Sequence, residues 1–179
     1  MTAPEVDAAL GQVAAVAAEP SETPKKLSMV VMSGDFDKLF GAFIIATGAK
    51  AMGMDVVMFF TFWGLRAIRK ANVRTGTSVF GKLIGIMYGG DIEKANPSQF
   101  SFFGIGRWMF KKMMKSKGVT DIKELRDLAV DMGVRMYGCD MSMTVMEMPQ
   151  SSMIDCIDQP VGVAVFLAEA MDSQITLFV

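Results

Sequence analysis

Two thiols, Cys139 and Cys156, are the side chains in this sequence with the clearest capacity for covalent chemistry. The chain has 179 residues and contains no histidine, which excludes Ser-His-Asp and Cys-His catalysis, histidine-containing zinc sites and histidine proton relays. Two thiols are too few for a four-thiolate zinc site, and they lie too far apart for a CxxC redox pair. The chemistry that remains is that of a single thiol, assisted by carboxylates, hydroxyls and basic groups.

Cys139 lies between a predicted strand, Val134–Cys139, and a helical run predicted from about Ser142. In open parallel sheets, ligands and reactive groups gather where strands end, and the unpaired N–H groups of a helix start stabilise a thiolate. Asp140, Met141 and Ser142 would form this helix start, with Asp140 or Ser142 as its cap. The neighbouring carboxylate opposes thiolate formation. A buried, unreactive cysteine is therefore the alternative interpretation.

Cys156 is a weaker candidate, because Asp155 and Asp158 flank it in a loop. Nearby carboxylates disfavour the negatively charged thiolate, so we expect the pKa of Cys156 to be raised. It becomes a second, resolving thiol only if the fold brings it beside Cys139.

A polar turn follows the first predicted strand and is a candidate pocket loop. It contains Ser33, Gly34 and Asp35, which suit a turn and the cap of the next helix. The turn lacks the glycine spacing of dinucleotide-binding and Walker A loops, so no nucleotide cofactor is predicted.

Short apolar runs alternate with helical segments along most of the chain. The first two runs are apolar throughout, which favours a parallel sheet covered on both faces. We therefore predict a three-layer α/β/α fold with a mainly parallel sheet of about five strands. The predicted strands are Leu27–Met32, Asp55–Phe60, Val134–Cys139 and Ile175–Val179, and the helices flanking them are Phe36–Met52, Asp121–Met132 and Val161–Met171.

Residues 25–179 are predicted to form one domain, preceded by an Ala-rich tail or linker at residues 1–24. A weak helix over residues 6–18 is the alternative for the tail. Glu5 and Asp7 interrupt its apolar run, so it does not resemble a secretory signal. No stretch reaches the roughly 18 apolar residues needed to cross a bilayer. Two free thiols and no export signal favour the reducing cytoplasm.

The net charge of −1 results from two segments of strongly opposite charge. Residues 64–118 contain eleven basic and two acidic side chains, a local charge of +9, and the rest of the chain carries −10. This stretch is too long for an ordinary strand-to-helix connection, so we interpret it as an insertion. Such an asymmetry favours an acidic partner, an anionic membrane surface or self-association. The pI of about 5.5 argues against nucleic-acid binding.

The second half of this insertion has the pattern of a basic amphipathic helix. Arg107, Lys111 and Lys115 recur every fourth residue and form one stripe. This composition is typical of helices that bind membrane interfaces or protein partners. Packing of the apolar side against the protein's own core is the alternative. The apolar residues predicted on the opposite side are Phe102, Ile105, Met109, Phe110 and Met113.

Three segments, Ser33–Leu65, Gly133–Met146 and Pro160–Val179, resemble the DsrE/DsrF/DsrH-like sulfur-relay superfamily. The motifs that carry the resemblance are FFTFWGL, CxMSM and the ending VxxFLxxA…ITLF, and they are closest to a longer DsrE-like subgroup often labelled peroxiredoxin. The resemblance implies an oligomeric α/β/α protein of the cytoplasm. It also implies that Cys139, the cysteine of CxMSM, accepts sulfane sulfur, and that the partners are small sulfur-carrier or rhodanese-like proteins.

Three functions follow from these observations. The leading hypothesis is a persulfide carrier or sulfurtransferase that uses Cys139 and needs no metal or cofactor. The second is a non-catalytic adaptor that docks through the basic insertion to an acidic partner or peripherally to the inner membrane face. The third, a thiol peroxidase, is weak because Met136-Tyr137-Gly138-Cys139 lacks the Thr of the usual Thr-x-x-Cys pattern.

Overall fold

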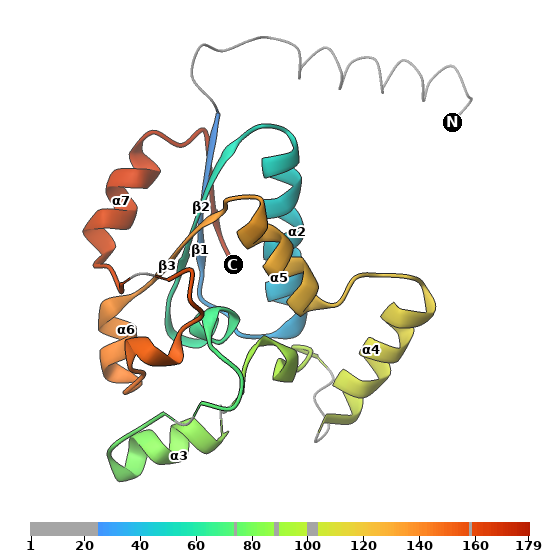
Figure 1. Ribbon diagram of the computed structural model, residues 1–179, viewed down its shortest axis with the longest axis vertical. Coiled ribbons are helices and arrows are strands. Elements are labelled where there is room, and N and C mark those ends of the chain that lie inside the picture. The colour runs from blue at the N-terminus through green and yellow to red at the C-terminus, as the bar shows by residue number, and fades with distance from the viewer. Residues whose placement is uncertain (1–24, 74, 88–89, 100–103, 158) are drawn as a thin grey trace.

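The sheet at the centre of the molecule has four parallel strands in the order β3-β2-β1-β4 (Figure 1). The computed structural model describes residues 25–73, 75–87, 90–99, 104–157 and 159–179, so the predicted tail at residues 1–24 lies outside the described residues. The parallel arrangement confirms the prediction. The strands are β1 (Lys26–Val31), β2 (Asp55–Phe60), β3 (Arg135–Gly138) and β4 (Ile175–Phe178).

Against the expected count of about five strands, the described residues form four. Beside β3, where a further strand would pair, a single bridge joins Cys139 to Val161. Gly162, the next residue, is the N-cap of a helix. The chain therefore leaves the sheet after one residue of pairing.

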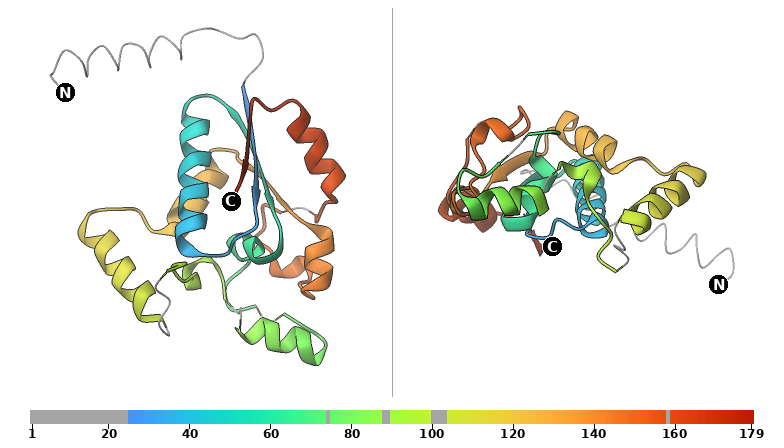
Figure 2. Two further views of the ribbon diagram at one scale, coloured as in Figure 1. Left: turned by 180° about the vertical axis from the view of Figure 1, so that it is seen from behind. Right: turned by 90° about the horizontal axis from the view of Figure 1, so that it is seen from below.

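Helices cover both faces of the sheet, which confirms the three-layer α/β/α architecture. In Figure 2, α2 and α5 lie on one side of the strands and α7 lies on the other. At the carboxyl ends of the strands, α6 follows β3 directly, and α3 and α4 project from the same end (Figure 1). The helices are α2 (Phe36–Ala51), α3 (Val79–Met87), α4 (Ile105–Ser116), α5 (Ile122–Asp131), α6 (Asp140–Val145) and α7 (Val163–Met171), with 3-10 turns η1 (Phe62–Ile68), η2 (Ile92–Lys94) and η4 (Gln150–Ser152).

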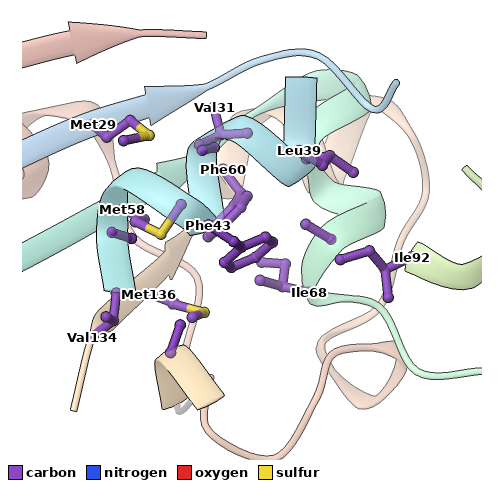
Figure 3. Packing of buried hydrophobic residues seen from close by; sticks show 14 of the residues in the cluster. Met29, Val31, Leu39, Phe43, Met58, Phe60, Ile68, Ile92, Val134 and Met136 are labelled. Atoms are coloured by element: carbon purple, nitrogen blue, oxygen red, sulfur yellow. The ribbon is translucent and has the colours of Figure 1, made fainter. Parts of the chain in front are cut away.

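The larger hydrophobic core lies between the sheet and the layer of α2 and α5 (Figure 3). Met29 and Met58 of the central strands are fully buried, as the continuous apolar runs predicted. The Phe43 and Phe60 rings stack with centroids 6.2 Å apart, a contact that contributes about 0.5–1.5 kcal/mol beyond burial. This core fixes β2 and therefore the position of β3 beside it.

A smaller cluster on the other face holds α7 against the sheet. It consists of Val57, Phe59, Cys139 and Phe166. The Phe59 and Phe166 rings stack with centroids 5.1 Å apart. Phe166 is the one fully buried residue of α7, and the partly buried Ala170 packs against the same cluster, so Phe166 is the main apolar attachment of α7.

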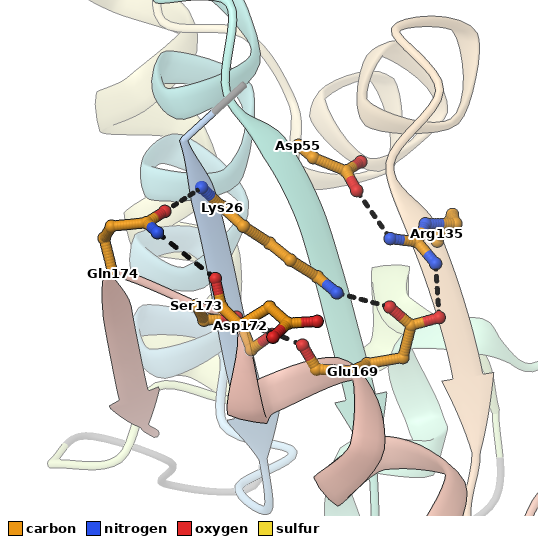
Figure 4. Close-up of polar contacts among 8 residues, drawn as sticks. Lys26, Asp55, Arg135, Glu169, Asp172, Ser173 and Gln174 are labelled. Carbon is orange, nitrogen blue, oxygen red and sulfur yellow. Dashed lines mark hydrogen bonds and ion pairs between the residues drawn. The ribbon is translucent and has the colours of Figure 1, made fainter. Parts of the chain in front are cut away.

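A network of charged side chains ties α7 to the amino ends of the strands (Figure 4). Glu169 of α7 accepts hydrogen bonds from Lys26 of β1 and Arg135 of β3. The second arm of the Arg135 guanidinium binds Asp55 at 2.6 Å. Hydrogen bonds from Lys26, and then from Arg135, lower the pKa of Glu169 despite partial burial. The network lies at the opposite end of the sheet from Cys139.

Candidate thiol site

Cys139 lies where β3 ends and α6 begins, at the carboxyl edge of the sheet. Its backbone N–H donates to the Phe60 carbonyl at 2.9 Å, and its carbonyl accepts from the Met143 N–H at 2.9 Å. The first bond continues the sheet and the second opens the helix, so both dihedral angles of Cys139 are fixed by its neighbours. Gly138 allows this tight junction, because a Cβ there would lie 3.1 Å from the Met143 sulfur.

The thiol is covered, with the residue only 5% exposed. Val57 and Phe59 of β2 and Phe166 of α7 form its apolar surroundings. Across the edge of the sheet, the Val161 N–H donates to the Gly138 carbonyl at 2.9 Å, and the Asp140 N–H donates to the Val161 carbonyl at 3.1 Å. A reagent therefore reaches the sulfur only after Val161 or α7 moves.

The start of α6 differs from the predicted one. The helix begins at Asp140 rather than near Ser142, and Cys139 itself occupies the N-cap position without a side-chain capping bond. The prediction that Asp140 or Ser142 caps the helix was wrong, because both residues lie within its first turn. Ser142 is fully buried, and its hydroxyl lies 2.7 Å from the Thr61 hydroxyl. Asp140 and Met141 are exposed.

Cys156 is exposed, in a turn after η4, and both cysteines are free thiols. Its pKa is raised, in the predicted direction, but the chief cause is partial burial of the thiol rather than the flanking carboxylates. Asp127 and Asp155 add to the increase, and Arg126 opposes it. At neutral pH Cys156 is therefore held in the thiol form.

The predicted pocket loop forms the turn between β1 and α2. The Ser33 N–H donates to the Val179 carbonyl at 3.3 Å, and the Asp35 N–H donates to the Ser33 hydroxyl at 3.2 Å. Asp35 is the N-cap residue of α2 but makes no side-chain capping bond. Ser33, Gly34 and Asp35 do not line the cavity beneath α3 that is described below.

On α4, the predicted basic stripe is turned largely toward the protein. Arg107 donates to the Lys94 carbonyl at 2.8 Å, and Lys111 lies 3.3 Å from Asp121 and 3.9 Å from Glu93. Lys115 is exposed.

The exposed side of α4 carries large apolar side chains beside Lys112 and Lys115. Ile105 is 66% exposed, and Met109 and Met113 are also exposed. Trp108 lies beside them, with the Lys112 ammonium 5.2 Å from its ring centroid. Phe110 instead packs edge-on against Phe36 of α2. Phe102 lies outside the described residues.

Glu147 connects the end of α6 to the start of α3, a link that sequence reasoning missed. Its carboxylate accepts hydrogen bonds from the backbone N–H and hydroxyl groups of Thr77 and Ser78. These bonds, those from Ser78 first, lower the pKa of Glu147 to about 2. Glu147 has a left-handed φ of 50°, a conformation uncommon for non-glycine residues. No local sequence pattern predicts this contact, because Ser78 and Thr77 lie 69 and 70 residues before Glu147 in the chain.

No three His, Cys, Asp or Glu side chains gather as a metal site within the part of the chain that the structure describes. Over the same residues, no helix is both long and apolar enough to span a bilayer.

Comparison with known proteins identifies the family. Residues 23–178 match the model of the DsrE/DsrF/DrsH-like family. An uncharacterized protein of Bacillus subtilis, YrkE, is 34% identical over 160 residues, which cover 89% of this chain and 99% of that one. The sulfur carrier protein DsrE2 of Allochromatium vinosum is 33% identical over 160 residues, covering 87% and 98%. The chain therefore belongs to the DsrE/DsrF/DrsH-like family, and its family and likeness to DsrE2 indicate a sulfur-relay role.

Proposed function

We propose that this protein carries sulfane sulfur as a persulfide on Cys139 and passes it to a thiol of another small carrier protein or a rhodanese-like protein. The observation that carries the proposal is the position of Cys139 at the junction of β3 and α6. In open parallel sheets, ligands and reactive groups gather at this carboxyl edge, where strands end and helices begin. The sulfur-carrier name of the relative DsrE2 supports the same chemistry.

The transfer is an exchange between thiols and persulfides. The Cys139 thiolate attacks the outer sulfur of a donor persulfide, the donor's S–S bond breaks, and the donor leaves as a thiolate. In the second half, the acceptor thiolate attacks the outer sulfur on Cys139, and the Cys139 thiolate leaves. Each half forms one S–S bond and breaks one, so no external oxidant or reductant is consumed. The cycle requires no histidine and no cofactor.

The covered position of Cys139 makes access part of the mechanism. Val161 and Phe166 cover the thiol, so donor and acceptor must reach it through a transient opening. A persulfide held beneath this cover is shielded from water and from small thiols. We expect the partner to act on the surface formed by Val161 and α7.

Intact-mass analysis after incubation with a low-molecular-weight persulfide tests the assignment. The wild type and Cys156→Ser are expected to gain the mass of one sulfur atom, and Cys139→Ser is expected to gain none. Cys156→Ser is the matched control, since it removes the other free thiol and leaves Cys139 intact. An adduct that persists in Cys139→Ser and disappears in Cys156→Ser would contradict the proposal.

A second function, docking on an anionic membrane surface, is favoured by the orientation of α3 and α4. Gly81 and Gly85 of α3 face the protein: a Cβ on Gly85 would lie 2.5 Å from the Thr75 carbonyl oxygen. Large apolar side chains of α3 face outward, with Val79 82% and Phe80 79% exposed. Neither helix contains an acidic residue. Outward apolar side chains beside lysines are the composition of interfacial helices.

Co-sedimentation with vesicles tests the docking proposal. Vesicles that contain phosphatidylglycerol are expected to bind the wild type, and vesicles of phosphatidylcholine alone are expected to bind it weakly. Phe80→Glu and Met109→Glu should abolish binding. Met52→Glu, a similarly exposed residue (74%) at the far end of the molecule, should leave it unchanged. Equal binding by all three variants would reject α3 and α4 as the docking surface.

We also infer that copies of the chain associate through α7 and β4. The strand β4 is an edge strand with an exposed apolar side, and Phe178 is 72% exposed. Leu167 and Met171 of α7 are exposed as well. Unprotected edges and apolar patches of this kind favour association. Light scattering should give a multiple of the chain mass for the wild type and a smaller mass for Phe178→Glu. A monomeric wild type would refute the inference.

A further inference from the structure

A cavity of about 730 Å³ lies beneath α3, on the side of the helix that faces the protein. Its volume is within the range of small-molecule sites. It is separate from the thiol, because neither Cys139 nor any residue of its apolar cover lines it. The lining consists of Arg69, Asn72, Val73, Thr75, Gly76, Lys82, Gly85, Ile86, Gly90 and Lys94.

The charged groups of this cavity are all positive. Arg69, Lys82 and Lys94 line it, and no carboxylate does so among the described residues. Arg66 adds a further positive charge close to Arg69, and Asp91 is the acidic group that acts on Arg69 from nearby. Even with Asp91 counted, the charge around the cavity is strongly positive. Cationic donors without a carboxylate among the described lining residues are the chemistry of an anion site.

Arg69 provides an independent indication of a ligand. The residue is only 3% exposed, and its Nη2 donates to the Val73 carbonyl. Its Nε is buried and has no hydrogen-bond partner. Burial and the neighbouring Arg66 lower the pKa of Arg69, which reflects a cation with too little negative charge around it. A buried guanidinium without enough negative charge around it is costly, and an anion bound in the cavity would offset this positive charge.

Two glycines bring the cavity walls together. Gly85 lets α3 approach the Thr75 carbonyl, as described above. A Cβ on Gly90 would lie 2.3 Å from Cδ of Lys94, so the Lys94 side chain passes directly over this glycine. The Lys94 carbonyl is in turn bound by Arg66 at 3.4 Å and Arg107 at 2.8 Å. Lys94 is therefore held at the cavity wall by contacts of its own backbone.

We propose that this cavity binds a tetrahedral oxyanion, a phosphate or sulfate group, between Arg69, Lys82 and Lys94. A guanidinium and two ammonium groups suit such a group, because charge-assisted hydrogen bonds to its oxygens are short and strong. The cavity exceeds the size of one phosphate, so the natural ligand carries the group on a larger body. That body is either a soluble metabolite or a lipid headgroup.

Isothermal titration calorimetry with inorganic phosphate and with sulfate, at an ionic strength held constant with chloride, tests the site. One equivalent should bind the wild type. Lys82→Gln and Lys94→Gln should each raise Kd about tenfold or more. Lys117→Gln makes the same change at an exposed position outside the cavity and should leave Kd unchanged. The variants avoid Arg69, whose replacement could disturb folding.

Two results would overturn the proposal: the absence of saturable heat with the wild type, or an unchanged Kd in both lysine variants. Vesicle binding then identifies the source of the oxyanion. If saturating phosphate displaces the protein from phosphatidylglycerol vesicles, the site takes the lipid headgroup. If vesicle binding persists, the site takes a soluble anion. Both of these results retain an oxyanion site that depends on Lys82 and Lys94.

Discussion

The cover over Cys139 gives a quantitative prediction, because α7 contributes one fully buried ring, Phe166, to it. Phe166 is 6% exposed and stacks on Phe59, whereas Val163, Val165 and the other large side chains of α7 are exposed. Phe166→Ala removes the main apolar attachment of α7 and leaves the Glu169 ion network intact. We expect this substitution to increase the rate at which an alkylating reagent reaches Cys139.

The size of the effect follows from the burial of the ring. Replacing a buried Phe by Ala costs about 3–5 kcal/mol in a closed core. The cluster here has only four buried members, so its walls can partly collapse, and about 2–3 kcal/mol is a better figure. Phe166 is buried only while α7 is closed, so this loss acts on the opening equilibrium. At 1.4 kcal/mol per factor of ten, alkylation accelerates about 30-fold to 140-fold.

The assay is the rate of iodoacetamide alkylation of Cys139, followed by mass spectrometry in a Cys156→Ser background. That background is needed because Cys156 is exposed. Leu128→Ala is the control, since it also truncates a large apolar side chain but at an exposed position on α5, which covers the other face of the sheet. Its rate should stay within about threefold of the parent, as expected for surface changes below about 0.5 kcal/mol. Equal rates for Phe166→Ala and the parent, with circular dichroism unchanged, would refute the idea that α7 controls access.

Further measurements test other parts of the structure. Glu169→Gln should lower stability by about 1 kcal/mol, or the melting temperature by about 2–4 °C, whereas Glu93→Gln, with a partner 3.9 Å away, should not. Because the pKa of Glu169 is lowered on folding, its contribution is present above pH 4.5 and is lost as the pH falls through the lowered pKa; a difference that persists at pH 2 would contradict this. Glu147 has a pKa of about 2, so the NMR signals of the Thr77 and Ser78 amides should stay constant from pH 7 to 5 and shift only well below pH 4.5. Glu147→Gln should increase the rate of hydrogen exchange of these two amides at pH 7. Alkylation of Cys156 in Cys139→Ser should rise with pH with a midpoint above the ordinary 9.0; a midpoint below that value would show that burial does not control this thiol.

Much of the sheet could be predicted from the sequence because its central strands are apolar on both faces. β1 and β2 have continuous buried runs, which is the pattern that distinguishes a covered parallel strand from a half-exposed one. A continuous apolar run does not predict, however, where the sheet ends. Val161 bridges Cys139 for one residue, and the chain then enters α7, close to where a helix was predicted, so the sheet gains no full strand beside β3.

The orientation of α4 could not be predicted, although its amphipathic character could. A helical wheel separates the basic side from the apolar side, but it does not indicate which one meets the protein. Here Glu93, Asp121 and the Lys94 carbonyl attract Arg107 and Lys111 inward. The exposed apolar residues follow from these long-range polar contacts, which no local pattern encodes.

The candidate site, too, could be predicted only in part from the sequence. The place of Cys139 after β3 follows from the alternation of strands and helices. Its cover does not, because Val161 and Phe166 come from a segment that lies beyond the next loop. The cavity beneath α3 was missed for the same reason, since Arg69, Lys82 and Lys94 meet only when α3 folds back over the turn at Thr75.

The link made by Glu147 joins two parts of the molecule into one mechanical unit. Cys139 stands at one end of α6 and Glu147 just beyond the other. At 1.5 Å per residue, the six residues of this helix span about 9 Å. Movement of α3 away from the protein would therefore pull on Glu147 through its hydrogen bonds with Thr77 and Ser78. Glu147 lies just beyond the end of α6, and Cys139 lies at the start of the same helix. A partner that binds the insertion can therefore shift the position of Cys139 without contacting the thiol itself.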